Sequence, residues 1–105
     1  MASTDDEIAA HDRWPNSEAL AGLADEVWDI LVAECGASEQ GREAYRLEVA
    51  ERGWPEEWRF VGALGFGGKV RWDRHGKRLY VDCYREDETP ERKAMINRAN
   101  EALKL

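Results

Sequence analysis

The segment of residues 69–84, KVRWDRHGKRLYVDCY, concentrates side chains that could bind an anion. Its cationic and imidazole groups fall within ten residues around a His-Gly pair: Lys69, Arg71, Arg74, His75, Lys77 and Arg78. Guanidinium and ammonium groups gathered in this way bind phosphate oxygens, on a nucleic acid or on a smaller anionic ligand. A solvated hairpin tip is the alternative, because exposed charge is common on any protein surface.

A second set of candidate side chains is acidic and belongs to an expected helix over 17–35. Asp25, Glu26, Asp29 and Glu34 lie largely on the outward side of that helix. An acidic surface of this kind could meet the basic groove of a nucleic-acid-handling protein, as DNA-mimicking inhibitors do. For each single residue, a solvated helix face is the simpler interpretation.

Catalytic and metal-binding patterns are weak in this sequence. The two histidines, His11 and His75, show no paired spacing, and no Cys-x-x-Cys occurs. Cys83 falls on an expected core face, which favours a buried thiol over a nucleophile. The loop LGFGGK over 64–69 is not a P-loop, because Val70 follows the Gly-Lys pair and a strand, not a helix, comes next. We therefore expect no enzyme, no cofactor and no metal.

The periodicity of apolar residues predicts the elements that hold these side chains. The expected elements are helices over 17–35 and 38–52, strands over 58–64, 69–73 and 78–84, and a helix from Pro90. Thr89 is placed to cap that last helix. The order ααβββα predicts a single α+β domain over 1–105, with a three-stranded antiparallel meander and a mobile tail over 1–14.

The register of the second hairpin follows from a two-residue turn at His75-Gly76. The opposed pairs are then Asp73/Arg78, Trp72/Leu79, Arg71/Tyr80, Val70/Val81 and Lys69/Asp82. This register collects apolar side chains on one face and opposite charges on the other. Trp72 points inward beside Leu79, so we expect it to anchor the core.

For the first strand, the sequence allows more than one assignment of which side chains face the core. A two-residue turn at Phe66-Gly67 pairs Ala63 with Val70, which turns Trp58 and Phe60 to the opposite face. Three explanations stay open: a glycine bulge that reverses the parity, a sheet covered on both faces, or an exposed aromatic strip. In the third case Trp58 and Phe60 would contact a partner protein.

Composition limits the class of protein. No apolar run is long enough to span a bilayer, and the acidic N-terminus does not resemble a signal peptide, so we expect a cytoplasmic protein with reduced thiols. Residues 1–57 hold 15 acidic and 4 basic side chains, net −11, and residues 58–105 hold 7 acidic and 11 basic, net +4. The resulting net charge of −7 argues against a general nucleic-acid binder, although the second half could carry a local basic patch.

Two stretches, LGFGGK over 64–69 and YVDCYREDETPER over 80–92, resemble small uncharacterised proteins of actinobacterial phages and prophages. The similarity covers about residues 58–105. It implies no activity, cofactor or catalytic residue, but a small accessory protein in a bacterial cytoplasm that binds and modulates or inhibits a host protein. This non-catalytic role is the leading prediction, with Asp25, Glu26, Asp29, Glu34, Trp58 and Phe60 as partner contacts. The alternative is nucleic-acid or anionic-ligand binding through the hairpin over 69–78.

Overall fold

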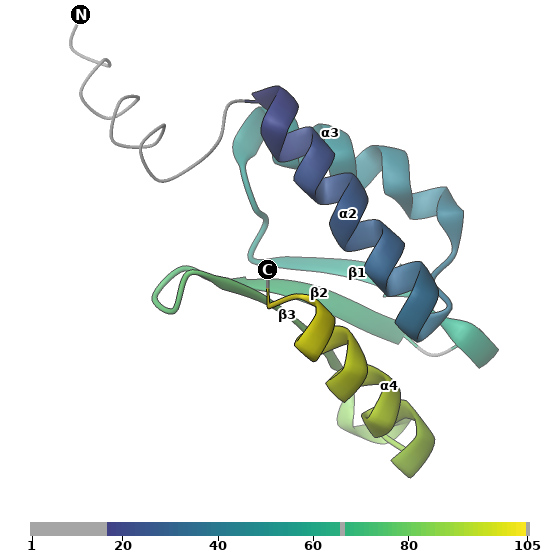
Figure 1. The fold of residues 1–105 in the computed structure, drawn as a ribbon. Coiled ribbons are helices and arrows are strands. Elements are labelled where there is room, and N and C mark those ends of the chain that lie inside the picture. Colours follow the sequence, from purple (N-terminus) through teal and green to yellow (C-terminus); the bar gives the residue numbers. More distant parts are fainter. Residues whose placement is uncertain (1–16, 66, 105) are drawn as a thin grey trace, which may run out of the picture.

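A computed structural model describes residues 17–65 and 67–104 (Figure 1). The elements are α2 (Ser17–Cys35), η1 (Glu39–Gly41), α3 (Arg42–Arg52), β1 (Glu57–Val61), η2 (Ala63–Gly65), β2 (Gly67–Asp73), β3 (Arg78–Cys83), η3 (Arg85–Asp87) and α4 (Pro90–Ala102). The three strands form one antiparallel sheet in the order β1-β2-β3. The predicted α+β architecture is confirmed, and the predicted mobile tail over 1–14 lies outside the described residues.

Helix α2 forms the centre of the helical layer because its apolar residues recur at spacings of three and four. Its buried side chains are Leu20, Ala24, Val27, Trp28, Leu31 and Cys35. Gly36, at a φ of 64°, ends the helix and donates its N–H to the Val32 carbonyl. The next helix begins later than predicted, because Ser38 first caps the short 3-10 turn η1.

Aromatic rings build the core between the helices and the sheet. Trp28 is 1% exposed, and its ring centroid lies 5.6 Å from that of Tyr45 and 6.4 Å from that of Phe60. The Trp28 indole N–H donates to the Ser38 carbonyl at 3.1 Å, so its one polar atom is satisfied. Tyr45 of α3 also packs against Trp58, with centroids 5.6 Å apart.

The register of β2 and β3 is the predicted one, but the turn is different. Both strands stop at the Asp73/Arg78 pair, so four residues, 74–77, form the connection. The positive φ of 52° falls on Lys77 and not on Gly76. The Asp73 carboxylate accepts the His75 N–H at 3.0 Å, which closes the turn with a side chain in place of a tight two-residue bend.

The predicted register of β1 is wrong. Trp58 pairs with Val70 and Phe60 with Gly68, because the connection over 62–66 contains the 3-10 turn η2 and is longer than two residues. Trp58 and Phe60 therefore share the face of Val70 and point toward the helices. No bulge is required to turn them inward, and the explanation by an exposed aromatic strip is wrong.

Gly68 allows the Phe60 ring to pack closely against β2. A Cβ at this position would lie 2.3 Å from the Phe60 ring, so only glycine lets the ring lie across the strand. For Gly68 the requirement is the close approach of an aromatic side chain.

Helix α4 closes the free edge of β3. Thr89 caps the helix as predicted, accepting the Arg92 N–H at 3.1 Å. The side-chain amide of Asn100 makes two hydrogen bonds to the backbone of Val81, as a neighbouring strand would. Its oxygen accepts the Val81 N–H at 2.6 Å, and its nitrogen donates to the Val81 carbonyl at 3.2 Å. Ala99 and Leu103 of the same segment are buried in the core that α2 shares with the sheet. The helices thus pack against one face of the sheet and against its β3 edge (Figure 1).

Candidate anion-binding surface

The sheet face that points away from the helices carries alternate residues of all three strands, which we call the open face. Its side chains are Glu57, Arg59, Val61, Lys69, Arg71, Asp73, Arg78, Tyr80, Asp82 and Tyr84. Most of these side chains are solvent-accessible, and Val61 is 59% exposed. Period-two alternation places charged residues here because the opposite face takes the apolar ones.

The predicted anion-binding residues divide between the open face and the hairpin tip. Lys69, Arg71 and Arg78 lie on the open face, whereas Arg74, His75 and Lys77 lie in the exposed 74–77 turn. The hairpin therefore brings all six onto one continuous, protruding surface. Their arrangement along a hairpin was predictable from the sequence, and their position on an uncovered sheet face was not.

Carboxylates balance part of the positive charge on the open face. The Lys69 ammonium lies 3.8 Å from Glu57, and Arg71 lies 3.9 Å from Glu57 and 3.7 Å from Asp82. Arg78 lies 3.9 Å from Asp73, as the predicted pairing implied. The pairs of Arg71 and Arg78 are solvent-accessible and add little stability, so these two cations can exchange partners.

The Asp73 carboxylate accepts hydrogen bonds from the turn in addition to pairing with Arg78. Hydrogen bonds from the backbone N–H groups of Gly76 and His75, together with the Arg78 charge, lower its pKa below the ordinary value. Asp73 is therefore an anion held by the turn itself. The hairpin tip beyond it presents only basic and neutral side chains, in the order Arg74, His75, Gly76 and Lys77.

Sequence reasoning missed a cluster around Tyr84. The Lys69 ammonium lies 4.3 Å from the centre of the Tyr84 ring, and the Arg59 guanidinium lies 5.8 Å from it. Lys69 is only 12% exposed as a side chain, whereas Tyr84 keeps 39% of its surface accessible. Cations near an aromatic ring stabilise its position through the negative ring face. The wrong register of β1 concealed the nearness of Arg59 to this ring.

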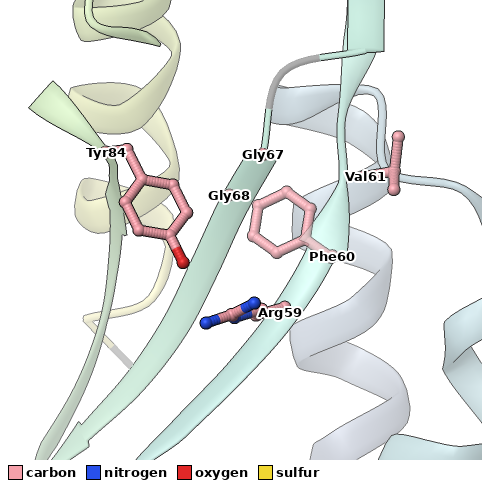
Figure 2. Close-up of a pocket in the computed structure, with 6 residues that line it drawn as sticks. All are labelled: Arg59, Phe60, Val61, Gly67, Gly68 and Tyr84. Carbon is pink, nitrogen blue, oxygen red and sulfur yellow. The ribbon is translucent and has the colours of Figure 1, made fainter. Parts of the chain in front are cut away.

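A cavity of about 280 Å³ opens beside Tyr84 at the glycine end of β2. Its lining residues are Arg59, Phe60, Val61, Gly67, Gly68 and Tyr84. Figure 2 shows the Tyr84 ring reaching over β2 from the β3 side, with Arg59 and Phe60 on the β1 side. The glycines leave backbone as part of the lining, so the cavity joins apolar surface to one guanidinium.

Three of the four predicted acidic contacts take part in ion pairs within the molecule. Arg42 lies 2.7 Å from Asp29 and 3.7 Å from Asp25, and it also donates to the Asp25 carbonyl at 3.1 Å. Glu34 of α2 pairs with Arg98 of α4 at 3.3 Å. These contacts join α2 to its neighbouring helices, which gives the acidic residues a structural role. Glu26, the fourth, is exposed.

The two aromatic contacts predicted for a partner belong mainly to the core. Phe60 is 5% exposed and packs on Trp28, and Trp58 is half-buried against Tyr45. The exposed apolar side chain on β1 is Val61, from the opposite face of the strand. In the observed register, the β1 side chains on the open face are therefore Arg59 and Val61, and not Trp58 and Phe60 as expected.

The thiols face the interior, in agreement with the prediction for Cys83. Cys35 and Cys83 are both buried, and burial raises the pKa of Cys35 to about 11. Within residues 17–65 and 67–104, no three His, Cys, Asp or Glu side chains lie close enough to hold a metal ion. In the same part of the chain, no helix has the length and apolarity needed to cross a bilayer. His11 lies outside the described residues.

Comparisons with protein-family models, curated proteins and solved structures found no match. The resemblance of residues 58–105 to actinobacterial phage proteins stays a prediction.

Proposed function

We propose that this chain is a non-catalytic binding protein whose partner is an anionic macromolecule, and whose contact surface is the open face with the hairpin tip. The observation that carries the proposal is the separation of charge between layers. Residues 17–52 hold nine acidic and three basic side chains, net −6, whereas residues 57–84 hold three acidic and six basic, net +3. The first range forms α2, η1 and α3, and the second forms the sheet and the hairpin.

This separation supports directional binding despite the overall charge of −7. An approaching polyanion is repelled by the helical layer and attracted by the open face, so it meets the protein in one orientation. The net charge therefore limits the strength of long-range attraction without removing the local site. Salt should weaken the contact, because the Debye length is about 8 Å at physiological ionic strength.

Retention on immobilised heparin, a polyanion, tests the proposal. Arg74→Glu with Lys77→Glu reverses the tip and changes the net charge by −4. Arg52→Glu with Lys93→Glu changes the net charge equally, at exposed helical positions away from the open face. We expect the wild type and the helical variant to be retained at low salt and the tip variant to elute first. A wild type that flows through, or two variants that elute together, would contradict the proposal.

A second candidate is the phage-type accessory protein that acts in a bacterial cytoplasm on a host protein. The net charge of −6 on the helical layer supports an acidic contact surface there. Glu26 and Glu51 are exposed on α2 and α3 and can be changed without touching the Arg42 ion pairs. Capture of a host protein that is lost in Glu26→Lys with Glu51→Lys, but kept in the tip variant, would favour this candidate.

A further inference from the structure

We propose that the open face binds single-stranded nucleic acid, with Tyr84 as a stacking platform for one base beside the 280 Å³ cavity. This inference rests on the proposed function and names the class of its partner. Single strands expose the flat faces of their bases, which duplexes hide, and proteins bind them by combining aromatic rings with a cationic track.

The Tyr84 ring is prepared for stacking. Lys69 at 4.3 Å and Arg59 at 5.8 Å from the ring centre fix it over the sheet before any ligand arrives. The residue nevertheless keeps 39% of its surface accessible. A base that stacks on it therefore loses little affinity to the ordering of the side chain.

The cavity beside the ring suits a base and its nearest phosphate. On the open face, Val61 and the backbone of Gly67 supply apolar lining, and Arg59 supplies a charge at the same site. Its volume of about 280 Å³ lies just below the usual range for small-molecule pockets, which fits one ring system better than a large ligand. A guanidinium next to an aromatic ring is a pairing that recognises both a base and a phosphate.

A track of cations leads from this cavity to the hairpin tip. Arg71 and Arg78 lie along the open face, and Arg74 and Lys77 extend it past the end of the strands. Tyr80 offers a second ring on this route, with the Arg78 guanidinium 5.8 Å from its centre. The seven residues of β2 span roughly 20 Å, the length of about six stacked nucleotides.

Stacking must contribute much of the affinity, because Glu57, Asp73 and Asp82 offset part of the cationic charge. This partial neutralisation distinguishes the proposed site from one that binds phosphates alone. A site that depends on phosphates alone would favour a duplex, with its higher charge density. A site that depends on Tyr84 favours the single strand.

Fluorescence anisotropy with a labelled twelve-nucleotide oligothymidine, an oligouridine of equal length and a matching duplex tests the inference at about 50 mM and about 200 mM salt. We expect the wild type to bind both single strands more tightly than the duplex. Tyr84→Leu should weaken single-strand binding roughly 5- to 150-fold, the loss of one stacked base. Tyr84→Phe keeps the ring and should bind as the wild type does. A thermal melt of each variant checks that it is folded.

The outcomes separate this inference from the proposed function. Retention on heparin without binding of either single strand would overturn the inference and leave an acidic protein as the anionic partner. Equal affinity of Tyr84→Leu and the wild type, or a preference for the duplex, would overturn the stacking role. A protein that binds neither heparin nor oligonucleotide would overturn both proposals.

Discussion

At the scale of single residues, burial in the core shifts the pKa values of two ionisable side chains. Burial raises the pKa of Cys35 to about 11 from an ordinary value of 9.0, and Glu34 adds to the effect. Burial also raises the pKa of Tyr45 far above its ordinary value. Burial keeps both groups neutral into alkaline solution, because a charge would lose its hydration in the core. Neither group is suited to nucleophilic or acid–base chemistry.

These shifts predict a loss of stability in alkaline solution. The unfolded state releases the Cys35 proton from about pH 9, whereas the folded state holds it until about pH 11. The free energy of unfolding is therefore unaffected by this group below pH 9 and falls as the pH rises through that window. Tyr45 adds to the fall once the pH exceeds the ordinary tyrosine value of 10.0.

Thermal melts between pH 7 and pH 11 measure this effect. Cys35→Ala removes the first group, so its melting temperature should fall less with pH than that of the wild type. Cys83→Ala provides a comparison at the other buried thiol. A wild type and a Cys35→Ala variant with parallel pH profiles would show that ionisation of Cys35 is not coupled to unfolding.

At the scale of elements, α4 stabilises the fold by completing an edge of the sheet. The Asn100 amide satisfies both the N–H and the carbonyl of Val81, which would otherwise face the helix without a strand partner. The edge of β3 is thereby closed to another chain at Val81. A side-chain amide can do this because it presents a donor and an acceptor on the same side, as the N–H and C=O of one residue in an extended strand do.

Asn100→Ala should destabilise the protein by about 2–3 kcal/mol, because it leaves two partly buried backbone groups without partners. Asn97→Ala provides the matched control on the exposed side of the same helix. Its cost should be close to zero, as for most surface substitutions. Urea denaturation compares the two, and equal midpoints would contradict a role for the Asn100 amide at the sheet edge.

At the scale of the whole molecule, one aromatic cluster connects the helical layer to the sheet. Trp28 lies at its centre, and even Gly41 is required there, because a Cβ at that position would lie 2.7 Å from the Trp28 ring. Trp72, which the sequence suggested as the anchor, is half-buried and stacks on Trp54 with centroids 6.3 Å apart. The cohesion of the two layers therefore depends more on Trp28 than on Trp72.

Trp28→Ala should cost on the order of 3–5 kcal/mol, a large part of the stability of a small domain. Trp72→Ala should cost roughly half as much, because its side chain stays partly in water. Denaturant titrations followed by circular dichroism rank the two variants. A larger loss for Trp72→Ala would contradict the central place of Trp28.

The local elements follow from short-range sequence patterns. Apolar spacing located α2, the alternation of polarity set the β2–β3 register, and Thr89-Pro90 marked the start of α4, because each depends on neighbours within a few residues. The charges of the hairpin were equally visible, so the candidate anion-binding residues could be selected without a structure.

The surroundings of those residues depend on how the elements pack. The β1 register depended on the 3-10 turn over Ala63–Gly65, and that shift moved Phe60 into the core and Arg59 to Tyr84. Asp25, Asp29 and Glu34 found their cations on other helices, at distances along the chain that no periodicity encodes. The physical reason is common to these cases: a side chain's partner is fixed by how layers pack, and packing is settled by the whole core at once.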